Sequence, residues 1–88
     1  MSGSALDHLP TLAAGERATV RTMQGDQPAL ARLSALGFSV GVEVQMLRNV
    51  RQHPMIVLVR RTRVALARDV AAGILMERQG HGLPQSAG

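Results

Sequence analysis

The feature that most constrains the fold of this chain is the shortness of the links between its apolar segments. Strand-like patterns of apolar residues occur at five places, residues 17–23, 42–50, 55–59, 64–67 and 74–77. The last three links contain 4, 4 and 6 residues, whereas a parallel crossover needs about a dozen residues. We therefore expect a mostly antiparallel sheet. Closing such short strands into a small barrel removes exposed edges, so an SH3-like barrel is the expected architecture.

Two helical segments interrupt the expected strands. Leu33 and Leu36 belong to a leucine series at helical spacing, Pro28 suits the first turn of that helix, and Gly37 suits its end. The stretch 68–73 predicts a single helical turn. The predicted fold class is therefore mainly β. It is a small SH3-like barrel of about five antiparallel strands with one short inserted helix and one helical turn.

The length of 88 residues leaves room for one small domain. We expect an N-terminal extension at residues 1–16, the barrel at 17–77 and a disordered C-terminal tail at 78–88, which is rich in glycine. No basic stretch followed by an apolar core opens the chain, so no signal peptide is expected. No apolar run approaches the roughly 20 residues that span a membrane. A soluble cytoplasmic domain is expected.

The charge balance points to an anionic partner. All ten basic residues are arginine, and against six acidic residues they give a net charge of +4. Nucleic acid, an anionic membrane surface and an acidic protein all stay open. Cysteine is absent, which excludes disulfides and thiol chemistry and suits a reducing cytoplasm. Because Phe38 is the only aromatic residue, we expect a core of aliphatic residues and methionine.

The sequence offers little for catalysis or metal binding. His8, His53 and His81 fall in loop or tail contexts, and none lies beside an acidic residue at a spacing suited to a general base. His-x-x-His and Glu-x-x-His spacings are absent, and the methionines are interpreted as flexible core residues. We therefore expect no enzyme, no catalytic residue, no metal site and no cofactor.

Binding of RNA or DNA is the main alternative that the basic composition raises. Arg60, Arg61 and Arg63 cluster at an expected hairpin, and Arg48 and Arg51 are expected to lie near it. Such a patch suits phosphates. Small barrels that bind single strands usually stack bases on exposed aromatic side chains, however, and this chain has one aromatic residue. A solvated basic hairpin is the preferred interpretation.

Two glycines mark the junction between the expected helix and the second expected strand. Gly37 is interpreted as a helix C-cap and Gly41 as a turn residue. The apolar residues around them are expected to edge a shallow groove between helix and barrel. They are Leu33, Leu36, Phe38 and Val40. A small barrel cannot hide every large side chain, so Phe38 is expected to act partly as core and partly as a contact.

At these glycines the sequence resembles a known family. LSALGFSVGVEV, residues 33–44, resembles the signature of the FeoA family, small cytoplasmic SH3-like domains of bacterial ferrous iron transport. HPMIVLVRRTRVALARDVAAGILME, residues 53–77, resembles the family's later pattern of strand, basic turn, strand, helical turn and strand. Two places depart from the pattern. Val40 replaces a frequent proline, and the hairpin at 61–63 lacks a frequent glycine, which predicts a tighter or differently typed turn.

The resemblance implies a non-enzymatic accessory protein that binds the cytoplasmic part of FeoB, the membrane ferrous iron permease with a GTP-binding domain, and modulates transport. Contact with the membrane would then pass only through that partner, and a homo-oligomer stays open. A peptide-adapter barrel with an unrelated partner is a further alternative. The expected partner-binding residues are Leu33, Leu36, Gly37, Phe38, Val40, Gly41, Arg60, Arg61 and Arg63.

Overall fold

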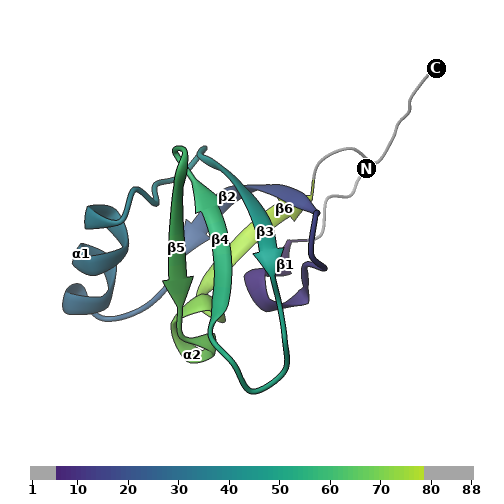
Figure 1. Ribbon diagram of the computed structural model, residues 1–88. Coiled ribbons are helices and arrows are strands. Elements are labelled where there is room, and N and C mark those ends of the chain that lie inside the picture. The colour runs from purple at the N-terminus through teal and green to yellow at the C-terminus, as the bar shows by residue number, and fades with distance from the viewer. Residues whose placement is uncertain (1–5, 79–88) are drawn as a thin grey trace.

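The computed structural model describes residues 6–78, which form a six-stranded antiparallel sheet with two α-helices and one 3-10 helix (Figure 1). The strands are β1 Asp7–His8, β2 Arg17–Met23, β3 Glu43–Arg48, β4 Met55–Val59, β5 Thr62–Leu66 and β6 Ile74–Arg78. The helices are η1 Leu9–Thr11, α1 Gln27–Ala35 and α2 Arg68–Ala71. The strand order is β1-β6-β2-β3-β4-β5. The prediction of a mainly β, antiparallel fold is confirmed.

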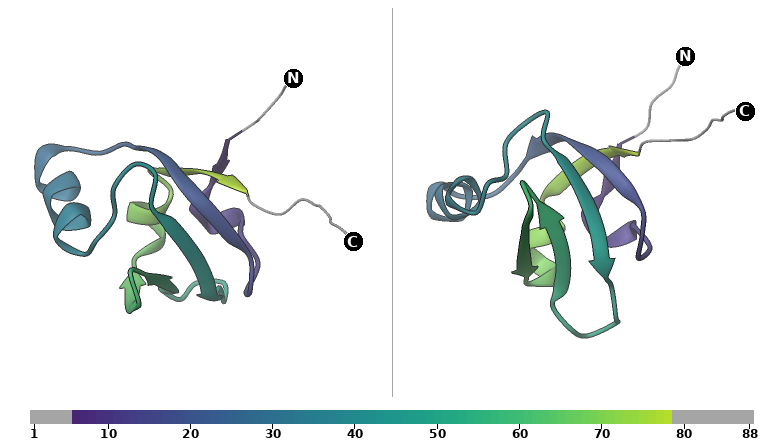
Figure 2. Two further views of the ribbon diagram at one scale, coloured as in Figure 1. Left: turned by 90° about the horizontal axis from the view of Figure 1, so that it is seen from above. Right: turned by 45° about the horizontal axis from the view of Figure 1, so that its top comes forward.

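The sheet bends strongly, so that β2 and β6 lie behind β4 and β5 in Figure 1, and Figure 2 shows the same bend from two other sides. Alternate residues of each strand point into the space enclosed by the bend. On β4, for example, Met55, Val57 and Val59 are fully buried, whereas Ile56 and Leu58 face outward and are half-buried. The core contains aliphatic residues, three methionines and Phe38, as the composition predicted.

Residues 7–12, which fall within the expected N-terminal extension at 1–16, belong to the sheet and to the core. β1 pairs with β6, and Leu9 and Leu12 have no exposed surface. β6 also continues to Arg78, one residue beyond the expected barrel. A two-residue strand carries no periodic signal, which is why the pattern missed it. The remainder of the expected tail, residues 79–88, lies outside the described residues.

Arg68 and Asn49 connect three parts of the fold that lie far apart in the sequence. One Arg68 amino group donates to two carbonyl oxygens of the β3–β4 loop, each at 3.0 Å, and the other donates to Asn49 Oδ1 at 2.7 Å. Asn49 Nδ2 donates in turn to the carbonyl oxygens of Pro10 and Leu12 at 2.9 and 2.7 Å. The start of α2, the β3–β4 loop and the segment around η1 are therefore held together by side chains.

α1 stands at the margin of the sheet, where Figure 2 shows it set apart from the strands. Asp26 caps its first turn by accepting a hydrogen bond from the Ala29 amide at 2.9 Å, and Pro28 occupies that turn. Leu33 is the only residue of α1 that is fully buried. The predicted helix is confirmed. It is anchored to the core mainly through one side chain.

Candidate functional site

The C-terminal end of α1 is closed by two backbone hydrogen bonds. The Gly37 amide donates to the Ser34 carbonyl and the Phe38 amide donates to the Leu33 carbonyl, both at 3.0 Å. Gly37 has φ +105°, which a side chain would disfavour. This is the Schellman arrangement, and its usual apolar contact is made by Leu33 and Phe38, each 1% exposed. The C-cap interpretation is confirmed, and Phe38 belongs to the core, without exposed surface for a contact.

The rest of the glycine loop, residues 37–41, is tied to β2. The Gly41 amide donates to the Val20 carbonyl at 2.7 Å, and the Val20 amide donates to the Val42 carbonyl at 2.9 Å. Gly41 has φ +95°. Between the two anchors, Val40 is 64% exposed, more than any other large apolar side chain in the described part of the chain. Val40 is thus the apolar residue that this loop presents to solvent.

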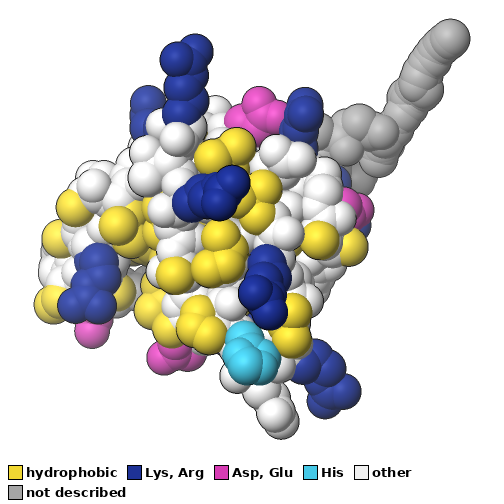
Figure 3. Space-filling view, in the orientation of Figure 1, with side chains coloured by type: hydrophobic (Ala, Val, Ile, Leu, Met, Phe, Trp, Pro, Cys, Tyr) yellow, Lys and Arg dark blue, Asp and Glu magenta, His cyan; other side chains and the backbone are white. Residues whose placement is uncertain are grey.

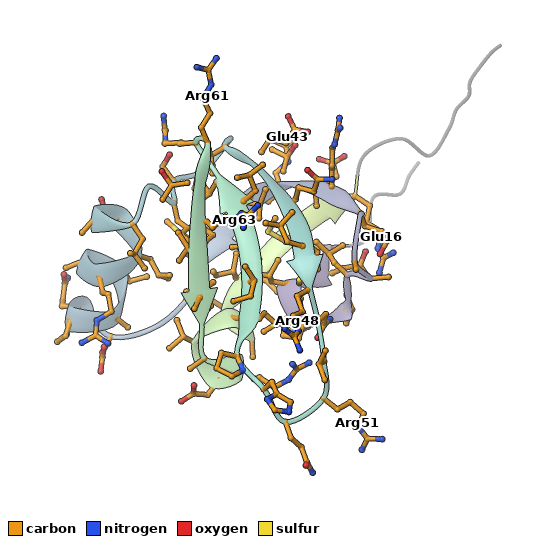
Figure 4. All side chains as sticks on the ribbon, viewed as in Figure 1. Glu16, Glu43, Arg48, Arg51, Arg61 and Arg63 are labelled. Atoms are coloured by element: carbon orange, nitrogen blue, oxygen red, sulfur yellow. The ribbon has the colours of Figure 1, made fainter. Side chains whose placement is uncertain are left out.

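The β4–β5 turn lies against the glycine loop. Arg60 Nε donates to the Gly37 carbonyl at 2.9 Å, and Arg60 Nη2 contacts Ser39 Oγ at 3.2 Å. Arg60 and Arg61 have φ values of +49° and +66°, which corresponds to a two-residue turn of type I′. The predicted tighter turn is present. Arg60 braces the glycine loop, whereas Arg61 extends from the turn into solvent (Figure 4).

The grooves of the molecule lie elsewhere than the sequence suggested. Leu33 and Phe38 are buried and Leu36 is half-buried, so they do not line an open groove together with Val40. A hollow of about 200 Å³ lies between α1 and α2 and is lined by Pro28, Ala29, Arg32 and Val70. A neighbouring hollow of about 240 Å³ shares Ala29 and Val70. The space between the helix and the rest of the domain therefore opens near the first turns of α1.

The acidic side chains are all engaged within the fold. Arg78 contacts Asp7 and Glu16 at 3.0 and 2.7 Å. The remaining pairs are Arg21 with Glu77, Arg17 with Glu43, Asp26 with the Ala29 amide and Asp69 with the Val70 amide. Among the described residues, the side chains of five arginines make neither an ion pair nor a hydrogen bond. They are Arg32, Arg48, Arg51, Arg61 and Arg63.

Four of these arginines, Arg48, Arg51, Arg61 and Arg63, come from β3, the β3–β4 loop, the β4–β5 turn and β5 (Figure 4). We call this side of β3, β4 and β5 the basic face. Figure 3 shows hydrophobic side chains gathered on it between the arginines. The excess positive charge of the protein is thus concentrated on a partly apolar surface.

The outward-facing apolar residues of the basic face are half-buried. They are Leu47, Ile56 and Leu58. The sequence carries no clear signal for their exposure, because an uninterrupted apolar run such as MIVLV suits a strand buried on both faces as well as one wrapped into a barrel. One end of the face is hollowed by about 280 Å³, with Arg17, Glu43, Gln45, Leu58, Arg60 and Arg61 around the hollow. Together these residues form a surface suited to recognition.

The described residues contain no cluster of side chains that could hold a metal ion. No group of three or more histidine, cysteine, aspartate or glutamate side chains comes together in residues 6–78. His8 Nδ1 lies 2.7 Å from the carbonyl oxygen of Ala72, which ties its ring to the end of α2. Within the same range no helix is long and apolar enough to cross a membrane. The surface that stands out is therefore the basic face.

The bent antiparallel sheet and its basic face define the class of protein as a small SH3-like domain. The FeoA domain matches residues 8–78, nearly all of the described chain. This protein belongs to the FeoA family, which is associated with ferrous iron transport and consists of small accessory domains. The resemblance seen at the glycine loop is confirmed.

Solved structures agree with this assignment. FeoA of Stenotrophomonas maltophilia, a prokaryotic SH3 domain protein in complex with zinc, is 30% identical with a TM-score of 0.70, over 78% of this chain and 87% of that one. FeoA of Chlorobium tepidum is 27% identical with a TM-score of 0.78, over 89% of this chain and 81% of that one. An iron uptake regulatory protein, also a FeoA, is 22% identical with a TM-score of 0.80, over 84% of this chain and 99% of that one. No curated protein sequence matches significantly.

Proposed function

We propose that this protein is a non-enzymatic, cytoplasmic accessory protein of bacterial ferrous iron uptake that binds the cytoplasmic part of FeoB and thereby modulates transport. Membership of the FeoA family supports the role in iron transport. The observation that carries the binding role is the basic face, where four arginines without partners surround half-exposed aliphatic side chains. Such a mixture of charge and apolar area is typical of protein-binding surfaces.

A protein partner fits the basic face better than RNA or DNA does. Base stacking needs exposed aromatic rings, and Phe38, the only aromatic residue of the chain, is 1% exposed. The aliphatic side chains between the arginines offer apolar area that phosphates cannot use. Nothing in the fold favours a peptide adapter with a partner outside iron transport over the family's own pathway.

The proposed partner-binding residues divide into contacts and supports. Val40, Arg61 and Arg63 are exposed, and we assign them direct contact. The remaining residues shape and brace the glycine loop that carries Val40. They are Leu33, Leu36, Gly37, Phe38, Gly41 and Arg60. A partner would therefore touch the glycine loop, the β4–β5 turn and the adjoining part of the basic face.

Affinity purification of the FeoB cytoplasmic region with this protein tests the proposal. Val40→Asp places a carboxylate in the contact, and we expect the affinity to fall about tenfold, as for loss of one good interface residue. Leu6→Asp is the matched control, because Leu6 is also an exposed large apolar residue, at 42%, but lies outside the proposed contact. Failure of the wild-type protein to bind FeoB, or equal binding by both variants, would contradict the proposed contact.

A further inference from the structure

The outer edge of β5 is an open backbone template. β5 is the last strand in the sheet order, and in the described part of the chain it pairs only with β4. The pair Val59–Thr62 closes the two-residue turn, so the hydrogen-bonded positions of β5 are Thr62, Val64 and Leu66. The backbone N–H and C=O groups of Arg63 and Ala65 therefore point away from β4, where they are free to bond another strand.

This edge is fixed against the core, and among the usual protections of an edge strand it has only charge. Val64 and Leu66 are 4% and 3% exposed, which fixes the strand against the core, whereas Arg63 and Ala65 are exposed. Proteins commonly guard edge strands with charged side chains, proline, bulges or extreme shortness, and β5 carries one charged side chain, Arg63. β5 contains no proline, and the register shifts of the sheet occur between β2 and β6 and between β3 and β4. The other edge strand, β1, has two residues and is too short to serve as a template.

Charge selects the occupant of this edge. Arg63 projects outward from β5 on the basic face, Arg61 precedes it at the turn, and neither has an acidic partner. A second copy of this chain would bring the same arginines together, and like charges on neighbouring strands are destabilising. The carboxylates of an acidic strand would instead be attracted to both of these arginine side chains. The open edge favours an extended segment, and the unpaired positive charge favours one that is acidic.

We propose that the outer edge of β5 binds an extended acidic segment of a partner protein as an additional strand of the sheet. The guest carries a carboxylate beside Arg63 and an aliphatic side chain beside Ala65, whose small methyl group leaves Ile56 of β4 uncovered, since Ile56 is the cross-strand neighbour of Ala65. This inference rests on the proposed function in that it specifies how a protein partner is recognised. FeoB is the partner in which such a segment is expected.

A synthetic peptide tests the chemistry without FeoB. We would use a blocked peptide of about seven residues in which glutamate and valine take turns at every second position, with threonine between them, so that both lie on one face of the strand. The analogue with lysine in place of glutamate is the control. Nuclear magnetic resonance then follows the amides of the full chain. We expect the hydrogen exchange of the Arg63 and Ala65 amides to slow on addition of the acidic peptide only, because these amides gain acceptors.

Substitutions on β5 separate edge pairing from simple charge attraction. Ala65→Pro removes an N–H that β4 does not use, so the fold is retained while the edge is blocked. We expect Ala65→Pro to abolish peptide binding. Ala65→Val retains the backbone N–H, so it should still bind the peptide. Arg63→Glu should weaken binding about fivefold or more. Arg32→Glu makes the same charge change at another partner-free arginine, on α1, and should change affinity less than about twofold.

Several results would overturn the inference. These are equal binding of the lysine peptide, unchanged binding by folded Ala65→Pro, protection of amides elsewhere, or preferential protection of the same amides by an oligonucleotide. Self-association that Ala65→Pro removes would assign the edge to a second copy instead. If FeoB binds wild type and Ala65→Pro equally, the inference fails and the proposed function stands. If the acidic peptide adds to β5 but FeoB does not bind, the proposed function fails and the edge site stands.

Discussion

At the scale of single residues, the β4–β5 turn combines an unfavourable backbone with a useful side chain. Arg60 and Arg61 both have positive φ, a region that costs a residue with a side chain about 1–2 kcal/mol. Arg60 offsets part of that cost through its hydrogen bond to the Gly37 carbonyl. Arg61 has no such bond in the structure. The strain at Arg61 is thus retained without a stabilising contact inside the protein.

Replacing Arg61 with glycine should therefore stabilise the protein. Glycine is the preferred second residue of a type I′ turn, so the free energy of unfolding should rise by about 0.5–1 kcal/mol. Urea denaturation measures the change. Arg63→Gly is the contrast, because Arg63 lies in a regular strand and glycine there should cost about 0.5–1 kcal/mol. A loss of stability in Arg61→Gly would show that the side chain has a stabilising role.

The two glycines of the glycine loop should respond differently to alanine. Both have positive φ, so each substitution should cost about 1 kcal/mol. A Cβ at Gly37 would lie 3.3 Å from Arg60 Cδ, whereas at Gly41 it would meet nothing within 4 Å. We expect Gly37→Ala to be the more destabilising in thermal or urea unfolding. In an Arg60→Ala background the difference should disappear, and its persistence there would refute the contact as the cause.

At the scale of elements, Arg68 and Asn49 form one unit that connects α2, the β3–β4 loop and the segment around η1. Each alanine substitution should destabilise the protein by about 1–3 kcal/mol, because each removes three hydrogen bonds, and those of Asn49 are part-buried. A double-mutant cycle in urea should show a coupling of about 0.5–3 kcal/mol.

Arg17 and Glu43 supply the control pair for that cycle. Their side chains are 61% and 51% exposed and 3.9 Å apart, and exposed pairs contribute about 0.5 kcal/mol or less. Equal coupling in the two pairs would mean that Arg68 and Asn49 act independently. The cycle therefore distinguishes a connecting unit from two unrelated surface groups.

At the scale of the whole molecule, the domain begins well before β2. Leu12 is fully buried, so Leu12→Ala should lower the free energy of unfolding by about 2–5 kcal/mol, as large-to-small core substitutions do. Leu6→Ala, at a position 42% exposed, should cost less than about 0.5 kcal/mol. Chemical denaturation of both variants measures these two changes in the free energy of unfolding. Similar small effects would restore the view of residues 1–16 as an extension.

Much of the architecture was predictable because it rests on local signals. Proline and glycine at helix ends, alternation along strands and links of 4 to 6 residues predict the elements from β2 to β6. The FeoA resemblance depends on the same local signals, because it is carried by residues 33–44 and 53–77. These features depend on residues close together in the chain, where sequence patterns are most informative.

Other properties depend on contacts between distant residues, which a sequence pattern does not contain. Phe38 is buried and Val40 exposed two positions later, because the helix cap and the anchor to β2 set the direction of the loop. Arg60 and Arg61 are adjacent and identical, yet one braces the glycine loop and the other faces solvent. Which side chains are covered is decided by packing, so the basic face and the open edge of β5 emerge only in the folded domain.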